Sequence, residues 1–133
     1  MDLYEGKPAP DDHDRPELGF NATQFLLDHT TTKTDPIVEL GIKTLRNYFK
    51  IKRVATAGYC FGAKYAFRFA TEQKRAAGVG VDVLVAAHIT NVTDDEIKAR
   101  AVPASVAAGR KSYREIFPSI SVDAHSQNQN TMH

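Results

Sequence analysis

One stretch decides how the fold of this chain is read: residues 54–67, VATAGYCFGAKYAF. A short β-prone apolar segment runs directly into a helix-prone one, and Cys60 stands at the junction with Gly58 two residues before it and Gly62 two residues after it. This G-x-nucleophile-x-G spacing is typical of a nucleophile elbow, a sharp strand-to-helix turn that exposes a reactive side chain. We therefore predict a strand, a tight turn with Cys60 at its tip, and a helix behind it.

The two glycines have a steric reason in this pattern. The turn strains the backbone of the central residue and brings strand and helix so close that side chains at positions 58 and 62 are expected to collide. The following helix aims its N-terminal amides and positive dipole end at Cys60, which favours a thiolate and a developing oxyanion. A lone cysteine is usually a small buried hydrophobe, but glycines, strand, turn and helix in phase favour a reactive site.

Length and composition limit the classes of function. The 133 residues are 42% hydrophobic and 25% charged, which indicates one globular domain. Seventeen Lys and Arg against sixteen Asp and Glu leave a net charge of +1, too small to hold nucleic acid or an anionic membrane. One cysteine excludes an internal disulfide and a cysteine-rich zinc site. We predict a cytoplasmic protein without a membrane span, secretory signal, metal or cofactor.

Helix-like and strand-like segments alternate along the chain. We predict helices over residues 20–29, 34–48, 61–73 and 93–101, and strands over 54–57, 81–88 and 104–108. This alternation predicts βαβ units with right-handed crossovers and a parallel sheet. The nearly continuous apolar run 81–88 is typical of a strand covered on both faces.

Several local signals refine these helices. Asn21 is expected to cap the first helix and Thr34 the second, with Pro36 in its first turn, and Thr93 with Glu96 forms a capping box. In the second helix, the positions expected to face the core are Ile37, Leu40, Gly41, Thr44, Leu45 and Tyr48, whereas Lys43, Arg46 and Asn47 are expected to face water. Residues 119–133 are rich in Ser, Asn and Gln, so we predict a domain over 1–118 and a disordered tail over 119–133.

Residues 58–66, GYCFGAKYA, resemble the G-Y-C-x-G-G cysteine elbow of the dienelactone hydrolase family of α/β-hydrolases. The segments 2–10, 34–38 and 83–96 are similar to flanking segments of this family, so the resemblance covers about residues 2–109. It implies a partial α/β-hydrolase fold: a three-layer core around a mostly parallel sheet of three or four strands with flanking helices. Residues 2–4 would then end the strand before the elbow unit.

The resemblance implies hydrolysis of a small-molecule lactone or ester. A thiolate would attack the carbonyl to form an acyl-enzyme, and a histidine-activated water would release the acid. The residues that the resemblance and the pattern assign to the site are Cys60 as nucleophile, Phe61 as a backbone oxyanion donor, Gly58 and Gly62 as the elbow glycines, and Tyr59 and His88 as candidates for the cleft. Among the other histidines, His29 is expected at the surface.

The sequence departs from the family pattern after residue 108. The family places an aspartate in the turn that matches residues 109–117, where this chain has Glu115 as its nearest acid. The family histidine lies on a later unit that has no counterpart here, and His125 beside Asp123 is a weak substitute. The chain therefore reads as the middle of a hydrolase with little or no turnover, which is expected to self-associate through exposed sheet edges.

Two other classes of function stay open at this stage. A non-catalytic remnant would keep the elbow without its base, and the absent aspartate and histidine favour it. A DJ-1-like redox or binding protein would also carry a cysteine on such a turn, and it requires a buried acid beside the thiol. A glutamine-amidotransferase-like site needs a later His-x-Glu, which the sequence does not contain.

Overall fold

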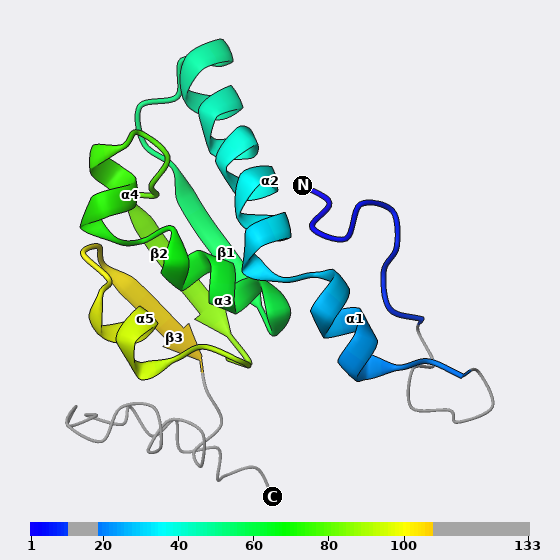
Figure 1. Ribbon diagram of the computed structural model, residues 1–133. Helices are drawn as coiled ribbons and strands as arrows, with labels where there is room; N and C mark the ends of the chain where they lie inside the picture. Colours follow the sequence, from blue (N-terminus) through cyan, green and yellow to red (C-terminus); the bar gives the residue numbers. More distant parts are fainter. Residues whose placement is uncertain (11–18, 108–133) are drawn as a thin grey trace, which may run out of the picture.

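The computed structural model describes residues 1–10 and 19–107. Its centre is a parallel sheet with the order β1-β2-β3, formed by β1 (Ala55–Tyr59), β2 (Val83–Ala87) and β3 (Ala104–Ala107) (Figure 1). The predicted α/β class and parallel pairing are confirmed. The predictions for residues 109–117, for Glu115, Asp123 and His125, and for the domain limit and tail at 119–133 lie outside the described residues.

Helices flank this sheet and join its strands. Their bounds are α1 (Ala22–Asp28), α2 (Thr31–Lys43) with a π-helical turn η2 (Thr44–Tyr48), α3 (Phe61–Arg68), α4 (Glu72–Ala76) and α5 (Asp94–Lys98). Figure 1 shows α3 and α5 in front of the sheet, α2 along the β1 side, and α1 farther out toward the N-terminal segment. No helix within residues 1–10 and 19–107 is long and apolar enough to cross a bilayer.

One face of the sheet is covered and the other is not. On the covered face, Leu84 and Ala86 of β2 are completely buried under α3. On the opposite face, Val83 and Val85 keep 41% and 45% of their surface exposed. Both crossovers advance in the same direction across the sheet, so right-handed connections place their helices on the same face. The prediction that β2 is covered on both faces is therefore wrong for the described part of the chain.

The helix predicted over 61–73 is two helices. In a continuous helix the carbonyls of Phe69 and Ala70 would accept from amides four residues ahead. Here the carbonyl of Phe69 accepts from the Val81 amide at 2.9 Å and that of Ala70 accepts from the Ala101 amide at 2.8 Å. Because these carbonyls bond to segments outside the helix, α3 stops here. The side chain of Thr71 then caps α4.

Helix α2 begins one turn earlier than predicted. Thr30 is its N-cap residue, and its carbonyl accepts from the amides of Lys33 and Thr34 at 3.0 and 2.9 Å. Pro36 therefore lies inside the helix, where the missing N–H removes one bond to the carbonyl of Thr32. The expected cap at Thr34 is wrong because Thr30 holds that position and Thr34 lies within the helix, where it is almost completely buried.

The face of α2 that meets the core also differs from the prediction. Its buried residues are Thr34, Val38 and Ile42, while Leu40 is 67% exposed and Tyr48 in η2 is 78% exposed. The five-residue spacing of the π-helical turn rotates the last residues out of phase with the helical pattern assumed from the sequence.

The prediction that Arg46 faces water is wrong, because its guanidinium is bound on several sides. Its guanidinium donates to the carbonyls of Lys52 and Gly80 at 2.9 Å and to Asp82 at 3.0 Å. Asp82 in turn accepts from the amide of Val54 at 2.9 Å. The hydrogen bonds of Arg46 and Asp82 therefore connect η2 to the segments that precede β1 and β2.

The N-terminal segment is a turn rather than the end of a strand. The carboxylate of Asp2 accepts from the amides of Tyr4 and Gly6 at 2.9 and 2.6 Å. The backbone amide of Lys7 donates to the carbonyl of Tyr4 at 2.9 Å. An aspartate that bonds to amides two and four residues ahead favours a turn over an extended strand.

The N-terminal signals of two helices are confirmed. Asn21 accepts from the amide of Gln24 at 3.0 Å at the start of α1. Thr93 and Glu96 form the complete capping box of α5, since each side chain accepts from the backbone amide of the other at 3.2 and 3.0 Å. Helix α5 ends at Lys98, three residues before the predicted end.

Candidate active site

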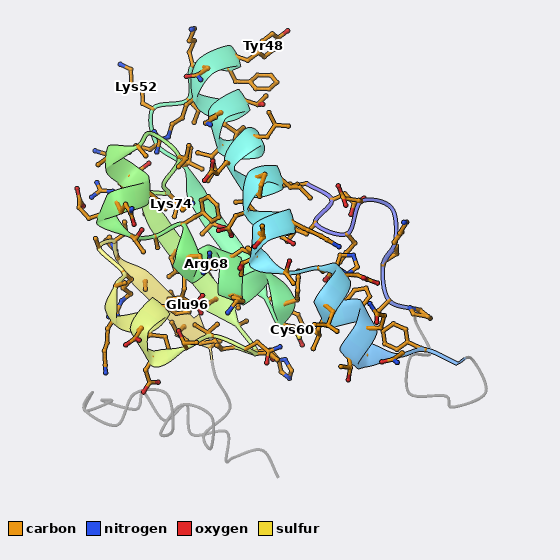
Figure 2. All side chains as sticks on the ribbon, viewed as in Figure 1. Tyr48, Lys52, Cys60, Arg68, Lys74 and Glu96 are labelled. Atoms are coloured by element: carbon orange, nitrogen blue, oxygen red, sulfur yellow. The ribbon has the colours of Figure 1, made fainter. Side chains whose placement is uncertain are left out.

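Cys60 lies at a sharp turn between β1 and α3, at the lower end of α3 in Figure 2. Its backbone has φ 49° and ψ −113°, a conformation that non-glycine residues rarely adopt. Its amide donates to the carbonyl of Ala87 at 3.1 Å, and its carbonyl accepts from the amide of Ala63 at 3.0 Å. Bonds to the neighbouring strand and to the helix therefore hold this strained residue in place.

The two glycines beside Cys60 differ in what surrounds them. A Cβ atom on Gly58 would lie 2.5 Å from the carbonyl oxygen of Gly62 and 2.7 Å from the Cα of Ala63. A Cβ atom on Gly62 would meet no neighbouring residue within 4 Å, so the collision expected there does not occur. Gly62 instead borders an apolar cavity of about 310 Å³ that also touches Val38 and Ile42 of α2.

The hydrogen-bond partner of the Cys60 sulfur is Thr90. Sγ of Cys60 lies 3.7 Å from Oγ1 of Thr90, and this hydroxyl lies 3.3 Å from the carbonyl oxygen of His88. Sequence reasoning missed Thr90. A signal was present, because residues that follow neighbouring parallel strands emerge at the same edge of the sheet, and Thr90 follows β2 as Cys60 follows β1.

The loop that carries Thr90 is fixed at both ends. The His88 amide donates to the carbonyl of Ala107 at 3.0 Å, and the Lys64 ammonium donates to the carbonyl of Asn91 at 2.7 Å. His88 and Asn91 have φ values of 50° and 57°. Two strained residues thus enclose Thr90, and hydrogen bonds to β3 and α3 maintain them.

The two cleft candidates from the sequence, Tyr59 and His88, contact each other. Their rings are stacked at a centroid distance of 5.4 Å and an interplanar angle of 19°. Tyr59 is 69% exposed and projects from the uncovered face of the sheet. Within the described residues, the sulfur of Cys60 bonds to Thr90 rather than to either of these rings.

A group of aromatic rings surrounds Phe61, the residue that follows Cys60. The ring of Phe61 lies 5.3 Å from Tyr4 and 5.2 Å from Tyr65, measured between centroids. Burial raises the pKa of the Tyr4 phenol, and the charges of Cys60 and Asp2 raise it further. The Tyr4 phenol is therefore uncharged at neutral pH.

His29 belongs to this aromatic group and is half-buried, so its assignment to the surface is wrong. Its ring lies 4.3 Å from that of Phe25 and 5.4 Å from that of Tyr4. Its Nδ1 lies 2.7 Å from the carbonyl oxygen of Phe25, and Nε2 lies 3.4 Å from that of Tyr4. The imidazole thus joins α1 to the N-terminal turn.

Charged side chains brace the helices behind the site. Arg68 of α3 contacts Glu96 of α5 at 3.0 Å (Figure 2). Arg68 also contacts Asp35 of α2 at 2.6 Å, and Lys64 contacts Glu96 at 3.1 Å. Burial opposes the charge of Glu96, but bonds from the Thr93 amide, Arg68 and Lys64 outweigh burial and lower the pKa of this carboxyl. The network fixes the helix that begins just after the Thr90 loop.

Within the described residues, no group of three or more histidine, cysteine and acidic side chains is placed to hold a metal ion. In the part of the chain that the structure describes, the polar group placed against the sulfur is the Thr90 hydroxyl at 3.7 Å. This arrangement can present a nucleophilic sulfur at the edge of a sheet, beside the first turn of a helix.

Comparison with known proteins relates the chain to fungal hydrolases. It is 32% identical over 117 residues to hydrolase pyvD of Aspergillus violaceofuscus, covering 88% of this chain and 43% of that protein. It is 33% identical over 91 residues to hydrolase tropI of Talaromyces stipitatus, covering 68% of this chain and 33% of that protein. The chain thus spans less than half the length of these relatives, and no solved structure matches it.

The decisive comparison is with protein-family models. The model of the dienelactone hydrolase family matches residues 1–119, which include all the described elements. The chain therefore belongs to the dienelactone hydrolase family.

Proposed function

We propose that Cys60 is the nucleophile with which this chain cleaves the ester or lactone bond of a small molecule. The observation that supports the proposal most directly is the strained backbone of Cys60 at the turn between β1 and α3, held from both sides by main-chain hydrogen bonds. Strain of this kind is maintained where it positions a reactive group. Membership of the dienelactone hydrolase family supports the bond type.

The chemistry follows from thiolate addition to a carbonyl. The sulfur of Cys60 attacks the carbonyl carbon, a C–S bond forms, and the carbonyl electron pair moves to the oxygen. Phe61 is the first residue of α3, so its N–H has no acceptor within the helix and can donate to that oxyanion. The C–O bond then breaks, the alkoxide takes a proton from water, and an acyl thioester remains on Cys60. From a lactone, the acyl group keeps the new hydroxyl.

Release of the acyl group requires an activated water. Within the described residues no imidazole bonds to the sulfur, and the relatives are more than twice as long as the matched region. We therefore propose that this chain by itself becomes acylated once and turns over slowly. A redox-sensor function receives less support, because the polar partner of the sulfur is a hydroxyl rather than an acid.

A nitrophenyl ester tests this proposal. The native chain should release a burst of nitrophenolate equal to the protein concentration, and peptide mass spectrometry should place the acyl group on Cys60. Cys60→Ala should abolish both. Acylation of lysines with a burst that survives Cys60→Ala would overturn the assignment, and fast sustained Cys60-dependent turnover would overturn the single-acylation proposal.

A further inference from the structure

We propose that the hydroxyl of Thr90 is a positioning residue for Cys60, donating its proton to the sulfur when the sulfur is a thiolate. This inference rests on the proposed function, because it concerns the same nucleophile. Its basis is the 3.7 Å separation between Sγ of Cys60 and Oγ1 of Thr90, together with the 3.3 Å separation between that oxygen and the carbonyl oxygen of His88.

A threonine hydroxyl has one proton and two lone pairs, so it can serve both forms of the sulfur. Beside the thiol, Oγ1 accepts from S–H and donates to the His88 carbonyl, which is the arrangement in the structure. Beside the thiolate, rotation about the C–O bond turns the same proton toward the sulfur. The hydroxyl then gives up its bond to the His88 carbonyl, which at 3.3 Å is long for an O–H···O bond. It gains a bond to the thiolate, which is the stronger acceptor because it is charged.

The backbone around Thr90 explains how the hydroxyl is aimed. His88 and Asn91 on either side of the loop have positive φ, and Cys60 opposite them does as well. The bonds from the His88 amide to β3 and from Lys64 to the Asn91 carbonyl prevent the loop from relaxing. Three strained residues therefore meet at one hydroxyl–sulfur contact, which is the pattern of a site kept in place by its surroundings.

Tyr4 is a titratable group whose raised pKa has two causes that favour the neutral phenol, burial first and then the charge of Cys60. The Tyr4 phenol belongs to the N-terminal turn, whereas Thr90 follows β2, so the two can be changed separately. Because its pKa is raised above the ordinary value, the Tyr4 phenol is uncharged where a thiol titrates, so Tyr4→Phe removes a hydroxyl without changing the charge around Cys60. It is the control for loss of a hydroxyl other than that of Thr90, and its alkylation profile should overlay the native one.

The test is the rate of Cys60 alkylation by iodoacetamide as a function of pH, in the native chain and in Thr90→Val, Thr90→Ser and Tyr4→Phe. Thr90→Val should move the midpoint of the profile up by about one pH unit, which leaves roughly tenfold less thiolate at neutral pH and makes alkylation there slower by about three- to fivefold. The limiting rate at high pH should not fall and should rise modestly, because a thiolate of higher pKa is the stronger nucleophile. Thr90→Ser should restore the native profile.

A Thr90→Val profile that overlays the native one, or a Thr90→Ser profile like that of Thr90→Val, would show that the hydroxyl does not act on the sulfur. Should Thr90→Val fail to fold by circular dichroism, Thr90→Ala against Thr90→Ser gives the same comparison. The ester burst is scored separately. A burst that survives Cys60→Ala refutes the nucleophile, whereas the alkylation profiles judge Thr90 whether or not an ester reacts.

Discussion

Gly58 faces the carbonyl group of Gly62 so closely that a Cβ atom at position 58 would lie 2.5 Å from the carbonyl oxygen. The same Cβ would lie 2.7 Å from the Cα of Ala63. Both neighbouring atoms belong to the backbone of α3, so no side-chain rotation relieves the contact. The close packing of the end of β1 against the first turn of α3 therefore requires a residue without a side chain at position 58.

From this contact we expect Gly58→Ala to lower the free energy of unfolding by about 1–3 kcal/mol, because strand and helix must move apart. Gly62→Ala is the matched control: its Cβ meets no neighbouring residue, and alanine favours a helix over glycine by about 0.5–1 kcal/mol. Urea unfolding followed by circular dichroism measures both. Equal losses for the two variants would contradict the steric account.

The contacts of Arg68 with Asp35 and Glu96 predict a larger effect than a surface ion pair. Arg68→Met leaves two half-buried carboxylates without their guanidinium and should destabilise the chain by about 1–3 kcal/mol. Arg75→Met is the control, since Arg75 pairs with the exposed Glu72 on one helix, a contact of about 0.5 kcal/mol or less. Chemical denaturation should rank the two variants in this order.

Two carboxyl groups predict a loss of stability in acid. The pKa of Asp82 is lowered from 3.8, first by the Val54 amide and then by Arg46, and that of Glu96 is lowered from 4.5 by the bonds described above. A lowered folded-state pKa stabilises the protein above the unfolded value and loses this contribution as pH falls through the folded value. We therefore expect the unfolding temperature to decrease once the pH is lowered beyond about 4.5.

Asp82→Asn tests the acid prediction, because it cannot titrate. Its unfolding temperature should lie below the native one near neutral pH and approach it as the pH decreases toward 3. Glu72→Gln, a change at an exposed carboxylate, should run parallel to the native curve. A constant offset between Asp82→Asn and the native chain at every pH would show that Asp82 does not contribute through its charge.

The uncovered face of the sheet predicts self-association. Its exposed valines, Val83 and Val85, lie beside Ala55 and Ala57 in register and form an apolar strip with them, which Ser105 of β3 borders. Val85→Lys should reduce the average mass of the chain in light scattering at high concentration.

Leu40→Lys is the control for this prediction. Leu40 is also exposed, but it lies on α2 and away from the strip, so its replacement should leave the mass unchanged. An equal response of the two variants would indicate general stickiness, and a monomeric native chain would contradict the prediction.

Local signals predicted much of this fold. The capping box at Thr93, the cap at Asn21 and the apolar runs of the three strands act within a few residues, so their positions can be read from the sequence. The strand-to-helix turn at Cys60 is equally local. Its role as nucleophile stays a proposal.

The errors arose where distant contacts decide the structure. The break between α3 and α4 depends on carbonyls taken by Val81 and Ala101, and the position of Arg46 depends on Asp82. Periodicity does not encode either pairing. The Thr90–Cys60 contact needs the order of strands as well, because two loops 30 residues apart meet only once β1 and β2 are neighbours.

The strained corner at residue 60 is kept by main-chain bonds to Ala87 and Ala63, neither of which involves the sulfur. A single substitution of Cys60 by serine would thus exchange sulfur for oxygen while the scaffold keeps its shape. Evolution could then alter the reactivity of such a protein one atom at a time, with no redesign of the architecture that presents it.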